Sequence, residues 1–240
     1  VSRGLGDVYK RQWYSFQKIL RQEWVESSLS DLEQEEPDDL MMHPLRLALE
    51  VQSLMNENDW LVIDGGNTHF WSEIAVNMAG AQGKELAGIL HPGSFSMLGV
   101  GVSFGLAAKL NHPKDRVVVI SGDGAFLSGG LSIEAAFQEN VPITVVIDNN
   151  GGLTTISQQQ ERLFADERHV ATDFRDIPFH TMFEGMGGHG ELVEKPEDLK
   201  PALERALSSG KTACVNVRTR SAVSPIVLAT TSKRDKASIE

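Results

Sequence analysis

Three glycine-containing turns with short polar side chains each follow a run of apolar residues. They are Asp64-Gly65-Gly66-Asn67-Thr68-His69, Ser121-Gly122-Asp123-Gly124-Ala125 and Asp148-Asn149-Asn150-Gly151-Gly152. Glycines let backbone N–H groups approach a phosphate closely, and the helix starts that follow add favourable dipoles. The Asp123 carboxylate and the Asn150 amide offer the oxygen ligands that Mg²⁺ prefers beside phosphate and water. The residues indicate a Mg²⁺-diphosphate site, although such turns also occur without any ligand.

The elements around these turns alternate between helix and strand. Short apolar runs predict strands over residues 60–63, 117–120, 143–147 and 213–217, and helical patterns cover 44–57, 68–78, 99–110, 131–139 and 196–207. Continuous apolar strands that alternate with helices predict an α/β fold, a parallel sheet flanked by helices on both faces. Ligands of such sheets bind beyond the carboxyl ends of the strands, where the three turns lie.

Composition narrows the class of protein. The 240 residues include 22 Lys and Arg against 33 Asp and Glu, for a net charge of −11, which argues against nucleic acid as a partner. The single cysteine, Cys214, excludes an internal disulfide and a thiolate zinc cluster, and it fits a reducing, cytoplasmic setting. Residues 86–108 are uncharged, but His91-Pro92-Gly93-Ser94 interrupts them, so we expect no membrane span.

Four segments are expected along the chain. Residues 1–12 lack the hydrophobic run of a secretory signal and are interpreted as a non-native remnant. Residues 13–43 contain an acidic run and a possible short amphipathic helix around Leu20 and Trp24, and we interpret them as a linker from an upstream domain. Residues 44–220 form the ligand-binding domain, and 221–240, rich in Ser, Thr and Lys, form a surface tail.

Two of the motifs carry a family resemblance. Together these motifs, Gly122-Asp123-Gly124 and Asn149-Asn150, resemble the GDG…NN signature of thiamine-diphosphate enzymes. Asn150 lies 27 positions after Asp123. The resemblance runs from about residue 43 to 220 and is to the pyrophosphate-binding domain of the acetolactate synthase-like group. It implies that Mg²⁺ is held by Asp123, Asn150 and the backbone carbonyl of Gly152.

The resemblance implies further cofactor contacts. Asn67 and Thr68 would touch the diphosphate of the cofactor. Ser96 would offer its carbonyl to the aminopyrimidine ring, and Leu98 would lie beneath the bend between the thiazolium and aminopyrimidine rings. Met97 shares that loop, and core packing is the other interpretation of Met97 and Leu98. The expected cofactor-binding set is completed by Gly122, Asp123, Gly124, Ala125, Asn150, Gly152 and Leu153. His69 and His189 are interpreted as packing or turn residues and not as catalysts.

The function that the resemblance implies is decarboxylation and carboligation of 2-keto acids, as in acetolactate synthases. The alternatives within the family are a 2-hydroxyacyl-CoA lyase, an oxalyl-CoA decarboxylase or another 2-keto-acid decarboxylase, so the small-molecule substrate is a 2-keto acid or an acyl-CoA. In the family the activating glutamate lies on a separate pyrimidine-binding domain. We therefore expect a homodimer, a homotetramer or pairing with such a domain, or else a cofactor-binding subunit that is inactive without a partner. FAD, where the full-length enzyme has it, would lie outside this chain.

A nicotinamide-binding domain is the main rival interpretation. Gly99-Val100-Gly101 opens a predicted helix, and Asp123 follows a strand about twenty residues later, as a ribose-binding acid would. The third glycine position of that motif is occupied by Phe104, however, and no clear strand runs directly into Gly99. The dinucleotide interpretation also leaves Asn149 and Asn150 without a role.

Overall fold

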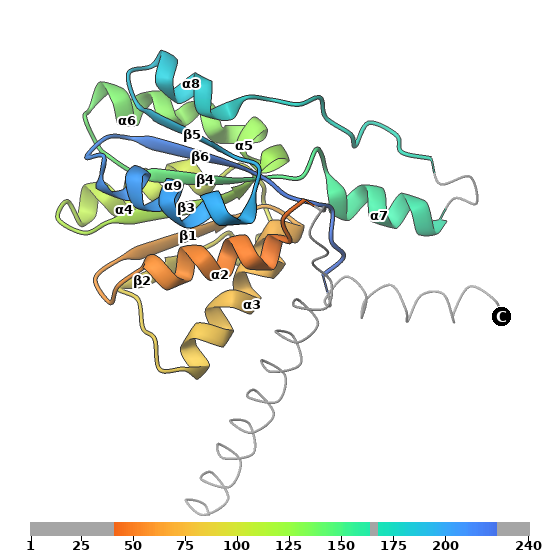
Figure 1. Cartoon of the computed structure of the whole chain (residues 1–240), viewed down its shortest axis with the longest axis horizontal. Coiled ribbons are helices and arrows are strands. Elements are labelled where there is room, and N and C mark those ends of the chain that lie inside the picture. The colour runs from red at the N-terminus through yellow and green to blue at the C-terminus, as the bar shows by residue number, and fades with distance from the viewer. Residues whose placement is uncertain (1–40, 164–167, 225–240) are drawn as a thin grey trace, which may run out of the picture.

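The structure, a computed structural model, describes residues 41–163 and 168–224. Its centre is a six-stranded sheet with every neighbouring pair parallel, in the order β2-β1-β3-β4-β6-β5 (Figure 1). The strands are β1 (Trp60–Asp64), β2 (Gly88–Leu90), β3 (Val117–Gly122), β4 (Thr144–Asn149), β5 (His189–Val193) and β6 (Ala213–Arg218). The predicted parallel α/β fold is confirmed.

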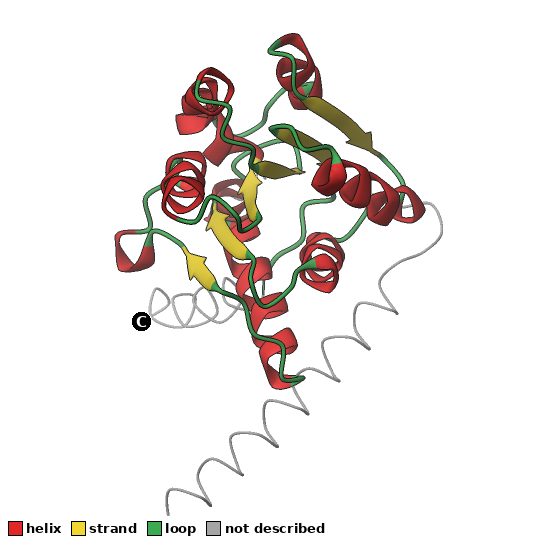
Figure 2. Ribbon diagram, turned by 90° about the vertical axis from the view of Figure 1, so that its left-hand side faces the viewer, coloured by secondary structure: helices red, strands yellow, loops and turns green. Residues whose placement is uncertain are grey.

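Helices cover both faces of this sheet, as Figure 2 shows. The α-helices are α2 (Pro44–Leu54), α3 (Asn67–Ala81), α4 (Gly101–Asn111), α5 (Asp123–Gly129), α6 (Glu134–Gln138), α7 (Thr154–Leu163), α8 (Phe179–Gly185) and α9 (Pro196–Ser208). The 3₁₀ turns are η1 (Gly93–Phe95) and η2 (Gly130–Ile133). Alternate strand residues enter opposite cores: Val118 and Ile120 pack with α2 and α9, whereas Val117 and Val119 pack with α4, α6 and α8. Both faces are therefore apolar, which is why the central strands read as continuous hydrophobic runs.

Two of the predicted helices begin at a proline. Pro44 opens α2, where the Nδ1 atom of His43 accepts the N–H of Leu45 at 3.0 Å, and Pro196 opens α9. Proline suits the first helical position because its fixed φ is already helical and it has no N–H to satisfy. Burial, together with the charge of Arg220, lowers the pKa of His43 to about 4, so its ring stays neutral and Nδ1 remains an acceptor.

Several boundaries differ from the predicted ones. The helix predicted from residue 99 begins at Gly101, because Gly99 has a φ of +89° and the amides of both glycines bond to the carboxylate of Asp64. The helix predicted over 131–139 is divided into η2 and α6. The sequence did not reveal β2, α5, α7, α8 or β5. His189, expected in a turn, begins β5 at the sheet edge.

The predicted segment boundaries meet the described residues at two places. Met42, at the end of the expected linker, is buried and forms a parallel β-bridge with Thr219. In the expected tail, Ser221 and Ala222 accept hydrogen bonds from the domain, and Ser224 is buried. Residues 1–40 and 225–240, which include the possible helix around Leu20, lie outside the described residues. No helix in the described ranges has the length and apolar character needed to cross a bilayer.

Candidate functional site

A cavity of about 340 Å³ lies where the central strands β1, β3 and β4 end. Its walls come from the starts of α3, α5 and α7 and from the loop before α4. It is lined by eleven of the twelve residues predicted to bind a cofactor: Asn67, Thr68, Ser96, Leu98, Gly122, Asp123, Gly124, Ala125, Asn150, Gly152 and Leu153. The twelfth, Met97, is not in the lining, and its side chain is 61% exposed.

Asp123 lies at the first position of α5, directly after β3, and it is 2% exposed. Its Oδ1 atom accepts the N–H of Gly124 at 2.7 Å, and Oδ2 accepts the N–H groups of Gly151 and Gly152, each at 2.9 Å. Burial and the nearby charge of Asp148 nevertheless raise the pKa of Asp123 to about 7, against the lowering effect of those three amides. Among the residues that the structure describes, no cationic side chain pairs with this carboxylate.

Asn150 brings a second oxygen to the same cavity. Its Nδ2 atom lies 3.5 Å from Oδ2 of Asp148, while its Oδ1 atom is buried without a hydrogen-bond partner. A buried amide oxygen without a partner is unfavourable, since its hydration is lost and nothing replaces it. Asn149, by contrast, turns away and donates to Oδ1 of Asn216 at 3.0 Å, so the two asparagines have different tasks.

Asp148 is a site residue that the sequence analysis did not single out. It is 1% exposed at the end of β4, and burial raises its pKa. Thr68 donates its hydroxyl to Oδ2 of Asp148 at 2.7 Å, and the hydroxyl of Thr219 donates to Oδ1. These bonds fix the carboxylate that lies 3.5 Å from Nδ2 of Asn150. The sequence feature that could have identified Asp148 is its position directly before Asn149 in the third glycine-containing turn.

The two residues predicted to touch a diphosphate are already engaged in part. The hydroxyl of Thr68 donates a hydrogen bond to Asp148. Asn67 donates through Nδ2 to Oγ1 of Thr154 at 3.2 Å and to Oε1 of Gln158 at 3.0 Å. Oδ1 of Asn67 is buried without a partner. The donors left for an anion are the backbone N–H groups at the first turn of α3, which have no carbonyl partner within the helix.

The loop before α4 is held by Asp64, the last residue of β1. Its carboxylate accepts the N–H of Gly99 at 3.1 Å and that of Gly101 at 2.7 Å, and its pKa is raised by burial. Ser96, in the same loop, has a left-handed φ of 48°, and Leu98 lines the cavity while 39% exposed. Asp64 therefore anchors the loop that carries Ser96 and Leu98.

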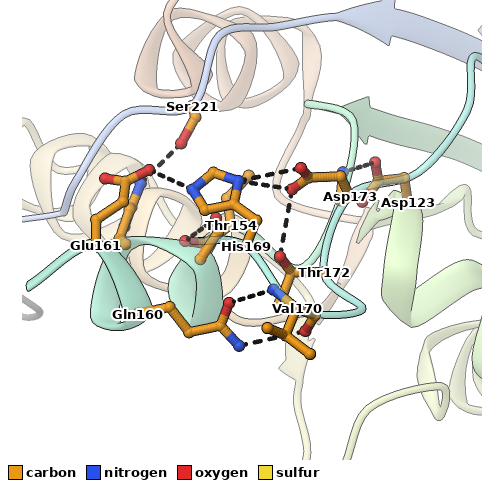
Figure 3. A network of polar contacts seen from close by, with 12 residues as sticks. Asp123, Thr154, Gln160, Glu161, His169, Val170, Thr172, Asp173 and Ser221 are labelled. Atoms are coloured by element: carbon orange, nitrogen blue, oxygen red, sulfur yellow. Dashed lines mark hydrogen bonds and ion pairs between the residues drawn. The ribbon is translucent and has the colours of Figure 1, made fainter. Parts of the chain in front are cut away.

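A second segment, residues 169–174, holds the loop that follows Asn150. The N–H of Leu153 donates to the carbonyl of Thr172, and the N–H of Phe174 donates to that of Gly151, both at 2.8 Å. Figure 3 shows how this segment is tied to α7: His169 lies between Glu161, 2.7 Å from Nε2, and Asp173, 2.9 Å from Nδ1. Hydrogen bonds to both carboxylates raise the pKa of His169. Thr155, in the segment that follows the proposed metal ligands, also lines the cavity, and its Oγ1 atom is buried without a partner.

Several known proteins are similar to this chain in sequence. Residues 64–217 match the family model described as thiamine pyrophosphate enzyme, C-terminal TPP binding domain. The acetolactate synthase large subunit of Mycobacterium tuberculosis is 35% identical over 199 residues, which are 81% of this chain and 35% of that protein. The catabolic acetolactate synthase of Raoultella terrigena is 28% identical over 176 residues (73% of this chain, 30% of that protein). The 2-hydroxyacyl-CoA lyase 2 of Mus musculus is 30% identical over 174 residues (72% and 26%).

The chain spans about a third of the length of the curated relatives it matches. The matched segment extends from the last residue of β1 nearly to the end of β6, and it contains all three strand ends that surround the cavity. The chain therefore belongs to the thiamine-pyrophosphate enzymes and contains their C-terminal cofactor-binding domain.

Proposed function

We propose that Mg²⁺ binds between Asp123, Asn150 and the backbone carbonyl of Gly152, and that it holds the diphosphate of thiamine diphosphate in the cavity. The observation that carries this proposal is the Oδ1 atom of Asn150, which is buried without a hydrogen-bond partner in a residue that lines the same cavity as Asp123. Oxygen atoms of a carboxylate, an amide and a carbonyl suit a hard cation that keeps waters and phosphate oxygens as its other ligands.

The charge at the site supports the same assignment. Asp123 and Asp148 are both buried, and each carboxylate is unfavourable there as an anion. A divalent cation beside Asp123 lowers the energy of the ionised form, because an opposite charge at close range favours the charged state of a carboxyl group. The start of α3 then adds backbone N–H groups for the phosphates.

The chain's own residues position the cofactor and shape the space around it. When bound, thiamine diphosphate supplies an electron sink for breaking and forming bonds next to a carbonyl group. Leu98 offers an apolar surface at one part of the cavity, and Asp64 fixes the loop on which Leu98 lies. Asp148 orients Asn150, and the N–H groups of Gly151 and Gly152 orient the carboxylate of Asp123.

For the whole enzyme we propose an acetolactate synthase-type activity on 2-keto acids, completed by a pyrimidine-binding domain that brings the activating glutamate. The relatives named acetolactate synthase that support this include one aligned over 81% of the chain. The relatives named 2-hydroxyacyl-CoA lyase favour a lyase acting on acyl-CoA compounds as the second candidate. Product analysis with a 2-keto acid and with a 2-hydroxyacyl-CoA distinguishes the two candidates in the assembled enzyme.

Removal of the partnerless oxygen tests the cofactor site. Calorimetry of the full chain with thiamine diphosphate and Mg²⁺ is expected to show an affinity at least tenfold weaker for Asn150→Ala. Asn111→Ala is the matched control, because Asn111 lies on α4 and its side chain bonds only to the carbonyl of Ala107 among the contacts described. Unchanged Mg²⁺-dependent affinity in Asn150→Ala, with the control also unchanged, would refute the assignment.

A further inference from the structure

A group of nitrogen and oxygen ligands lies beside the cavity, apart from the residues proposed to hold Mg²⁺. It consists of His69 and Glu73 on α3 and His91 in the loop after β2. One ligand atom from each residue lies within 4.8 Å of the other two. His69 and Glu73 are four positions apart, so they project from the same face of the helix.

We propose that His69, Glu73 and His91 bind a first-row transition-metal dication of the Zn²⁺ type. Two imidazoles with one carboxylate are a common three-residue donor set for such ions and leave a further position for water. Mg²⁺ prefers oxygen ligands in octahedral geometry, so it competes poorly for these nitrogens. The two sites thus differ in the chemistry of their donors.

The first two ligands are already at a suitable separation. The Nε2 atom of His69 lies 3.0 Å from Oε1 of Glu73. Two ligands of a tetrahedral zinc ion with bonds of about 2.0 Å are roughly 3.3 Å apart. In this structure the two atoms share a hydrogen bond. When a metal binds Nε2 of His69, the ring keeps its proton on Nδ1, and the Glu73 carboxylate coordinates the metal in place of accepting that hydrogen bond.

His91 needs only a local adjustment to complete the site. Its ring centroid is 5.2 Å from that of His69, and the residue is exposed, so it can turn without disturbing the core. Its Nδ1 atom accepts the N–H of Gly93 at 3.2 Å. Binding through Nε2 places the ring proton on Nδ1 and breaks that bond, a small cost beside the formation of a metal–imidazole bond.

The proposed metal adjoins the cofactor cavity through one residue. His69 lines the cavity and its side chain is 14% exposed, whereas Glu73 and His91 are absent from the lining. A metal on this group fixes the imidazole of His69 at the cavity wall while leaving Asp123 and Asn150 free for Mg²⁺. Substitution of Glu73 or His91 therefore tests the site without altering the residues that face the cofactor.

The test is a titration of the full chain with Zn²⁺, and with Co²⁺ as a spectroscopic probe, in excess Mg²⁺. The wild type is expected to bind one zinc ion and, with Co²⁺, to give the visible absorption of low-symmetry cobalt. Glu73→Gln and His91→Ala are each expected to weaken binding at least tenfold. His189→Ala is the control and should bind normally, since His189 also contacts a glutamate, Glu191, at 2.8 Å but belongs to no three-ligand group among the described residues.

Three results would overturn the proposal. The first is zinc affinity that survives in both Glu73→Gln and His91→Ala, and the second is zinc affinity that falls equally in His189→Ala. The third is loss of zinc binding in Asn150→Ala, which would place the ion at the proposed Mg²⁺ site. Failure of the proposed function has a different signature: Mg²⁺-dependent cofactor binding would be insensitive to Asn150→Ala whatever happens to zinc. Circular dichroism of each variant verifies that it has folded.

Discussion

The carboxylate of Asp123 accepts the backbone N–H of Gly152, 29 positions later, at 2.9 Å. This bond joins the start of α5 to the loop after β4, two segments that follow neighbouring strands of the sheet. It lies in the same cavity wall as Asn150. Two of the three residues proposed as metal ligands, Asp123 and Gly152, are thus hydrogen-bonded before any metal binds, which reduces the conformational entropy that binding must cost.

Asp123→Ala is expected to abolish Mg²⁺-dependent binding of thiamine diphosphate. The substitution removes the carboxylate ligand and leaves the charge of the diphosphate poorly compensated. Calorimetry with and without Mg²⁺ measures the effect. Asp198→Ala, an exposed change of the same charge on α9, is the control and should leave the affinity unaltered. Equal Mg²⁺-dependent affinity in Asp123→Ala and wild type would contradict the role of this carboxylate.

Leu98→Ala is expected to slow exchange of the thiazolium C2 proton more than it weakens cofactor binding. The side chain lines the cavity, and its removal loosens the orientation of the bound rings. Hydrogen–deuterium exchange followed by NMR, in the enzyme assembled with its pyrimidine-binding domain, gives the rate. Met97→Ala is the matched control, because Met97 is 61% exposed and outside the cavity lining. Exchange slowed equally by both substitutions would be incompatible with a specific role for Leu98.

The free energy of unfolding is expected to depend on the ionisation of Asp123. The pKa of this group is raised from 3.8 to about 7, chiefly by burial and then by Asp148. Between these values the native state holds a proton that the unfolded chain has released. Stability without divalent ions therefore falls as pH rises from 4 to 7, by up to about 1.4 kcal/mol per pH unit from this group.

Urea denaturation at pH 5 and pH 8, with divalent ions removed, measures that dependence. Asp123→Asn should show a smaller loss of stability between the two pH values than the wild type. Asp148, whose pKa burial also raises, contributes a loss of the same sign in both proteins. Mg²⁺ with thiamine diphosphate should restore stability to the wild type at pH 8. Identical pH dependence in the two proteins would show that Asp123 does not carry the effect.

Gly152→Ala is expected to destabilise the domain more than Gly151→Ala. Both glycines have a positive φ, +155° and +82°, but a Cβ atom at Gly152 would lie 2.2 Å from the carbonyl oxygen of Thr172. At Gly151 nothing lies within 4 Å, so only the left-handed backbone is penalised, by about 1 to 2 kcal/mol. Chemical denaturation should show a cost of about 3 kcal/mol or more for Gly152→Ala. Equal costs would mean that the loop moves away from Thr172 freely.

Local sequence patterns predicted the layers of this fold and the position of its cavity. The apolar, β-branched runs at β3 and β4 are typical of strands buried on both faces, and parallel strands bring their carboxyl ends to one edge of the sheet. Because Asp123 and Asn150 each follow one of these strands, both were expected at that edge. These conclusions needed only short-range periodicity and the geometry common to parallel sheets.

The tertiary structure decided which of these polar atoms are available to a ligand. Thr219, 71 positions after Asp148, takes up one oxygen of that carboxylate, and Asn216 takes up the amide of Asn149. Met97 and Leu98 are adjacent in the chain, yet only Leu98 faces the cavity, because the loop is held by the bonds from Gly99 and Gly101 to Asp64. Hydrogen bonds between residues so far apart in the chain produce no periodic pattern in the sequence from which they could be predicted. Residue types and spacing therefore specified the chemistry, whereas packing between distant segments selected the atoms that remain free to perform it.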